Sequence, residues 1–65
     1  MKITVNGEAR TTKALTLDEL CRELGFLEGR IATARNGEFV PAKLRAGVHL
    51  ADGDAIELLS PRQGG

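Results

Sequence analysis

Two Asn-Gly pairs, at residues 6–7 and 36–37, constrain the fold of this chain more than any other feature of its sequence. A two-residue type I′ turn needs positive φ at both central positions, so each pair predicts a tight turn between two strands. Before the first pair, Ile3 and Val5 alternate with polar residues, which is typical of a half-buried strand. The polar return, about residues 9–13, suits an edge strand. The chain is therefore expected to open with a β-hairpin.

One amphipathic helix is predicted to follow this hairpin. Thr16 and Glu19 have the spacing of a capping box, in which Thr16 accepts from the third helical amide and Glu19 accepts from the N–H of Thr16. Gly25 is the expected left-handed residue after the helix. The apolar residues between them recur at the spacing of a single helix face: Leu17, Leu20, Cys21 and Leu24.

Further strands are predicted in the second half of the chain. Residues 31–35 and 38–40 flank the second Asn-Gly pair, and Pro41 ends the second of these strands because it has no N–H for the ladder. Residues 41–47 are expected to be irregular or to form a single helical turn, and 48–50 to form a brief extended piece.

A last strand is predicted over residues 55–59, after the turn-forming residues 52–54. Its alternation places Ile56 and Leu58 on one face, and Leu59 on the other.

Hairpin, helix and later strands together indicate an α+β fold. If the last strand pairs parallel with the first at the centre, the fold is a β-grasp, the ubiquitin-like mixed sheet with one main helix packed across one face. Sixty-five residues suffice for one small domain, which we place at residues 1–59. Residues 60–65 have no apolar side chain and predict a flexible C-terminal Gly-Gly tail. The expected core packs strand residues under the helix face: Ile3, Val5, Ile56 and Leu58.

The composition excludes several classes of function. Nine basic and nine acidic residues cancel, so the net charge favours neither nucleic acid nor an anionic membrane as a partner. No apolar run is long enough to span a bilayer. Cys21 and His49 are the only residues of their kinds, so we expect no disulfide and no metal site. Cys21 is expected to be a buried structural thiol and His49 a solvated side chain. A binding or carrier module is favoured over an enzyme.

Gly64 and Gly65 are the residues with the clearest functional signal. Glycine has no Cβ, so an arm that ends in two glycines can enter a narrow channel and lie close to another backbone. Six extended residues reach at most about 20 Å. The Gly65 carboxyl could therefore enter a partner's active site while the domain docks outside. A free carboxylate is a poor electrophile, so it would need activation by the partner.

The chain resembles the ubiquitin-like sulfur carrier protein of thiamine biosynthesis, the ThiS family. The resemblance rests on the order and spacing of four segments: Asn6-Gly7-Glu8, residues 36–41, the turn 52–54 leading into 56–59, and Gln63-Gly64-Gly65. It implies a β-grasp fold, a cytoplasmic location and a carrier that is a substrate of enzymes and no enzyme itself.

The resemblance also implies the chemistry of the terminal residues. An E1-like enzyme adenylates the Gly65 carboxylate with ATP and Mg, which the chain itself does not bind. A sulfur donor such as a cysteine desulfurase then provides sulfur, and the resulting thiocarboxylate donates it to thiazole synthase. Gly64, Gln63 and Arg62 are expected to thread into the partner's active site.

Two residues are predicted to contact a partner. Leu59 is expected to be exposed beside the tail, where an apolar side chain can anchor a partner. Arg35, before the second Asn-Gly pair, is expected on the outer face of the sheet, where it could alter such a contact. The acidic helix face is expected to be solvated.

Other functions stay open at this point. The small subunit of molybdopterin synthase, also a sulfur carrier, has a similar fold and Gly-Gly end, but its relatives are usually longer. A ubiquitin-like modifier would form an isopeptide bond through Gly65. A plain β-grasp interaction domain with an inert tail is the last alternative.

Overall fold

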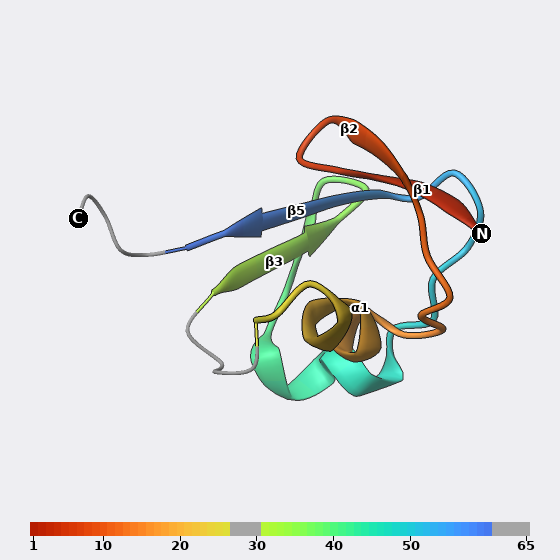
Figure 1. Cartoon of the computed structure of the whole chain (residues 1–65). Coiled ribbons are helices and arrows are strands. Elements are labelled where there is room, and N and C mark those ends of the chain that lie inside the picture. The colour runs from red at the N-terminus through yellow and green to blue at the C-terminus, as the bar shows by residue number, and fades with distance from the viewer. Residues whose placement is uncertain (27–30, 61–65) are drawn as a thin grey trace.

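The chain forms one mixed five-stranded sheet in the computed structural model, which describes residues 1–26 and 31–60. Its strands are β1 (Lys2–Val5), β2 (Glu8–Thr11), β3 (Ala32–Arg35), β4 (Glu38–Val40) and β5 (Ala55–Leu59). The spatial order is β2-β1-β5-β3-β4 (Figure 1). β5 lies between two antiparallel hairpins, parallel to β1 and antiparallel to β3. The predicted β-grasp fold is therefore confirmed.

Both Asn-Gly pairs form the predicted turns. Asn6 and Gly7 have φ of 50° and 85°, and Asn36 and Gly37 have φ of 52° and 85°. These left-handed conformations match the type I′ requirement that selects Asn and Gly. The boundaries of β2 and β3 differ from the predicted ones by one or two residues, because ladder bonds, and not composition, set where a strand ends.

The helix α1 (Leu17–Glu23) begins and ends at predicted signals. Thr16 Oγ1 accepts from the Glu19 N–H at 3.2 Å, and Gly25 has a left-handed φ of 92°. The prediction that Glu19 accepts from the Thr16 N–H is wrong by one residue. The Glu19 carboxylate accepts instead from the Leu15 N–H at 2.8 Å. Residues 15–17 pair with residues 48–50 through two backbone hydrogen bonds, and this pairing orients the backbone before the helix.

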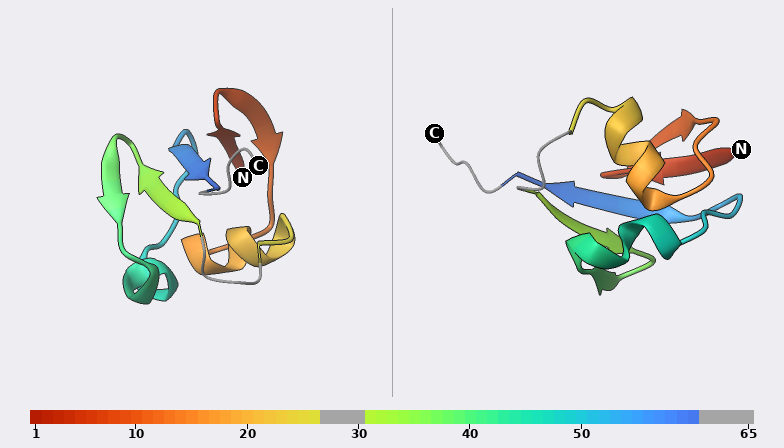
Figure 2. Two further views of the ribbon diagram at one scale, coloured as in Figure 1. Left: turned by 90° about the vertical axis from the view of Figure 1, so that its left-hand side faces the viewer. Right: turned by 90° about the horizontal axis from the view of Figure 1, so that it is seen from below.

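A 3₁₀ helix, η1 (Ala42–Gly47), occupies the segment predicted as irregular or as a single turn. It contacts α1, and both lie on the same face of the sheet (Figures 1 and 2). The opposite face of the sheet carries neither α1 nor η1. The described residues contain no helix long and apolar enough to cross a membrane.

The hydrophobic core lies between the sheet and the two helical segments. All eight predicted core residues are part of it, with Val5 and Leu24 half-buried at its margin. The prediction missed Ala14, Val40 and Leu50, which come from short or irregular segments where no periodicity marks them. The complete buried cluster is Ile3, Ala14, Leu17, Leu20, Cys21, Val40, Leu50, Ile56 and Leu58.

Candidate functional site

The C-terminal end of β5 is where the structure places the candidate site. β5 is the central strand, so both of its edges are paired, to β1 and to β3. Leu58 is buried against the core, whereas Leu59 is 68% exposed on the other face, as its alternation predicted. The predicted tail residues Arg62, Gln63, Gly64 and Gly65 lie outside the described residues. The described chain therefore leads to them from the middle of the sheet.

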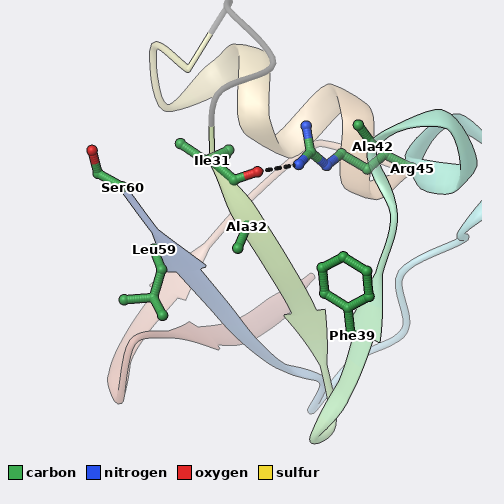
Figure 3. Close-up of a pocket in the computed structure, with 7 residues that line it drawn as sticks. All are labelled: Ile31, Ala32, Phe39, Ala42, Arg45, Leu59 and Ser60. Atoms are coloured by element: carbon green, nitrogen blue, oxygen red, sulfur yellow. Dashed lines mark hydrogen bonds between the residues drawn. The ribbon is translucent and has the colours of Figure 1, made fainter. Parts of the chain in front are cut away.

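An open groove lies beside Leu59, between the exposed face of the sheet and the η1 residues Ala42 and Arg45, and it has a volume of about 580 Å³. Leu59 is paired with Ala32 of β3, so their side chains share this face. Figure 3 shows the Leu59 and Phe39 side chains on two sides of the groove, with Ala32 between them. We call this the Leu59 groove; its lining is Ile31, Ala32, Phe39, Ala42, Arg45, Leu59 and Ser60.

Phe39 is a groove residue that the sequence reasoning did not single out. Its side chain is 69% exposed, while the next residue, Val40, is buried. The alternation along β4 could have identified it, since a strand with Val40 in the core must present Phe39 outward. Two large apolar side chains thus stand exposed beside the end of β5, which is a typical feature of a docking surface.

Arg45 forms the inner wall of the groove and was also missed. Its side chain is 6% exposed, and its Nε donates to Thr33 Oγ1 at 3.0 Å. A second guanidinium nitrogen donates to the Ile31 carbonyl (Figure 3). Arg45 therefore links η1 to Ile31 and to Thr33 of β3. β3 is the strand that pairs with Leu59.

The expectation that Arg35 lies on the outer face is wrong. Arg35 is paired with Ile56, which is 1% exposed, so the Arg35 side chain starts on the same face as the core. It donates to the His49 carbonyl at 2.8 Å and lies 4.0 Å from the Asp54 carboxylate. The burial of Thr33, two residues earlier, fixes this orientation. A contact between Arg35 and a partner stays a prediction.

Of the two titratable residues that the sequence highlighted, Cys21 lies in the core and His49 lies at the surface. Cys21 is buried, which raises the pKa of its thiol, although the charge of Arg45 opposes that effect. His49 is exposed, as predicted. Within residues 1–26 and 31–60, no three His, Cys, Asp or Glu side chains gather closely enough to hold a metal ion.

Asp54 is a buried member of a polar cluster at the start of β5. Burial alone would raise the pKa of Asp54, but three interactions outweigh it and lower the pKa below its usual range. The Asn36 side chain donates to the carboxylate at 3.0 Å, the Ala51 N–H donates at 2.8 Å, and Arg35 adds a positive charge. This cluster lies at the opposite end of β5 from the Leu59 groove.

Comparison with known proteins identifies a matching family and two similar solved structures. Residues 3–65 match the ThiS family. The crystal structure of the thiamine biosynthesis protein ThiS from Geobacter metallireducens superposes with a TM-score of 0.83 at 30% identity, covering 100% of both chains. The NMR solution structure of a thiamine biosynthesis protein from the same organism also gives a TM-score of 0.83 at 30% identity, covering 100% of this chain and 88% of that one.

A curated relative is much longer than this chain. The chain is 39% identical over 66 residues to a thiazole synthase of Paramagnetospirillum magneticum, strain AMB-1. The match covers 100% of this chain but 20% of that protein, so the chain spans about a fifth of the relative's length.

Proposed function

The chain belongs to the ThiS family of non-catalytic sulfur carriers in thiamine biosynthesis, and from this premise we propose that its reactive group is the carboxyl of Gly65. The observation that carries the proposal is that the family match continues through Gly64 to Gly65. The fold supports it, because β5 is the last described strand before these residues in the sequence and is paired on both of its edges.

The proposed reaction takes place in the active sites of partners. A carboxylate oxygen of Gly65 attacks the α-phosphorus of ATP, pyrophosphate leaves, and an acyl-adenylate forms. The persulfide sulfur of a donor such as a cysteine desulfurase then attacks the carbonyl carbon, AMP leaves, and an acyl disulfide forms. A thiol cleaves its S–S bond, which releases the thiocarboxylate of Gly65 and leaves a disulfide between the thiol and the donor. The resulting thiocarboxylate delivers its sulfur to thiazole synthase. The E1-like partner supplies ATP and Mg, and we place the sequence of steps in the cytoplasm.

Residues 60–65 act as the carrying arm in this proposal, beyond a domain of residues 1–59. Gly64 has no side chain to obstruct a channel, and Gln63 and Arg62 enter behind it. An extended arm of this length reaches about 20 Å at most. The domain must therefore dock close to the entrance of the partner's active site.

The Leu59 groove is proposed as the surface that docks. Its exposed apolar residues, Leu59 and Phe39, lie next to the origin of the arm. Burial of large apolar side chains at the centre of an interface typically supplies much of the binding energy. Docking there would hold the start of the arm against the partner and direct Gly65 inward.

Mass spectrometry of the intact protein tests this function. The chain is incubated with ATP, Mg and an E1-like enzyme of the thiamine pathway, first without and then with the sulfur donor. The expected products are an adenylate and then a species in which sulfur replaces one oxygen at Gly65. A variant lacking Gly64 and Gly65 is the control and should gain neither.

The same experiment separates the competing functions. Covalent ladders with other proteins would indicate a protein modifier. Sulfur transfer to a molybdopterin precursor, and none to thiazole synthase, would indicate the other carrier class. An unchanged mass with cognate partners would contradict both kinds of carrier.

A further inference from the structure

The Asn6 side chain continues the sheet beyond the end of β1. Its Nδ2 donates to the Leu58 carbonyl at 3.1 Å, and its Oδ1 accepts from the Leu58 N–H at 2.9 Å. The Asn6 backbone N–H donates to the Ile56 carbonyl at 2.8 Å. A carboxamide has the donor and acceptor of a peptide group, so Asn6 serves as one extra ladder partner for β5.

Asn36 makes an equivalent clamp at the other end of the same strand. Its Oδ1 accepts from the Ala55 N–H at 2.9 Å, and its Nδ2 donates to the Asp54 carboxylate at 3.0 Å. Both asparagines occupy the first position of an Asn-Gly turn, with nearly equal φ. The asparagine side chains of the two turns therefore hydrogen-bond to the two ends of β5. Asn6 bonds to the end that precedes residues 60–65.

We propose that Asn6 is a positioning residue that sets the direction in which the carrier arm leaves the sheet. The inference rests on the proposed role of Gly65. Without the Asn6 carboxamide, the Leu58 N–H and carbonyl lose both of these partners, and this end of β5 is held by the pairing of the strand with β3. The end of β5 then samples more orientations, and docking must select among them.

Selecting one of these orientations weakens the productive binding of the arm to the partner. Ordering a loosened segment on association lowers affinity because conformational freedom is lost. The chemistry itself uses groups of the partner, so the turnover of a correctly bound complex does not depend on Asn6. The Leu59 side chain, which follows Leu58 directly, is displaced by the same loosening.

The test compares Asn6→Gly with Asn36→Gly in the full chain. Glycine keeps the left-handed turn in both variants and removes only the carboxamide. ATP-dependent pyrophosphate release by the E1-like enzyme gives KM and kcat for each carrier. We expect N6G to raise KM about three- to tenfold, the effect of losing one or two hydrogen bonds, with kcat unchanged. N36G should lower the melting temperature similarly and leave KM near the wild-type value.

Hydrogen exchange gives a direct readout of the clamp. The Leu58 amide should exchange faster in N6G than in N36G. If N6G does not fold, N6D replaces it and N36G stays the control, because aspartate also tolerates the left-handed turn but cannot donate to the Leu58 carbonyl. Equal KM values for the two variants, or a loss confined to kcat, would overturn the positioning role. A wild-type chain that is never adenylated would instead refute the proposed function, while the exchange of Leu58 would still report on the clamp.

Discussion

Arg45 donates through Nε to Thr33 Oγ1 at 3.0 Å, and the same hydroxyl donates to the Val40 carbonyl at 2.7 Å. These two hydrogen bonds form a relay that joins η1, β3 and β4 beside the Leu59 groove. Both residues are buried, so neither can exchange its partner for bulk water. A buried donor left without an acceptor incurs the full desolvation cost of that donor.

Thr33→Val is therefore expected to destabilise the fold by about 1–3 kcal/mol, because it keeps the side-chain shape and removes the hydroxyl. For a domain of this size, each kcal/mol corresponds to roughly 4–8 °C in Tm. Thermal unfolding followed by circular dichroism measures the change. Thr11→Val, at an exposed position of β2, is the control and should stay within about 0.5 kcal/mol. Equal effects of the two substitutions would show that the relay contributes nothing.

Leu59→Ala should separate binding from stability. Because Leu59 is 68% exposed, its loss should change the free energy of unfolding by no more than about 0.5 kcal/mol. If the Leu59 groove docks the partner, binding to the E1-like enzyme should weaken by about 1–2 kcal/mol, as for an interface anchor. Isothermal titration calorimetry measures the affinity.

Leu15→Ala is the matched control for this docking test. Leu15 is 62% exposed but does not line the Leu59 groove. Its truncation removes the same apolar atoms from another part of the surface. If L15A weakened binding as much as L59A, the docking surface would have to be placed elsewhere.

The local signals in the sequence were sufficient for most of the fold. Asn6-Gly7 and Asn36-Gly37 require left-handed φ, and Thr16 with Gly25 bounds the helix, so each of these elements is specified by residues close in sequence. Leu59 was identified as exposed because Leu58 has to face the core. These predictions succeeded because strand and helix periodicities assign side chains to faces without knowledge of tertiary contacts.

The polar interior could not be predicted in this way. Arg45 is buried only because η1 packs against α1 and brings its donors to Thr33 and the Ile31 carbonyl. Thr33 is polar, so nothing marked it as the inward residue of β3, and a charged residue before the Asn-Gly turn, Arg35, was assigned to the outer face. Contacts between segments distant in sequence decide such positions, and single residue types do not reveal them.

Cys21 is expected to be protected from alkylation in the folded protein. The thiol is buried, and burial raises its pKa, so the reactive thiolate is both inaccessible and disfavoured. Reaction then requires unfolding, and for a domain stabilised by about 3–5 kcal/mol we expect a rate roughly 200- to 5,000-fold below that in denaturant. Iodoacetamide labelling followed by mass spectrometry gives both rates. Equal rates would mean that the core around Cys21 opens far more readily than its burial implies.

Acidification should weaken the fold partly through Asp54. Its pKa is lowered in the folded protein, whereas an unfolded aspartate titrates near about 3.9. A carboxyl whose pKa is lowered by folding stabilises the native state fully above the unfolded pKa, and the contribution is lost as the pH falls through the folded pKa.

Asp54→Asn should lower the free energy of unfolding by about 1–3 kcal/mol at pH 7, because Asn36, Ala51 and Arg35 lose a charged partner. Urea unfolding between about pH 6 and pH 2 should show the difference between wild type and D54N shrinking as the pH falls. Glu57→Gln, which removes an exposed carboxylate on β5, controls for the change in net charge. A difference between wild type and D54N that stayed constant down to the lowest pH, or matched that of E57Q, would contradict the assignment of this stabilisation to the ionised Asp54 carboxylate.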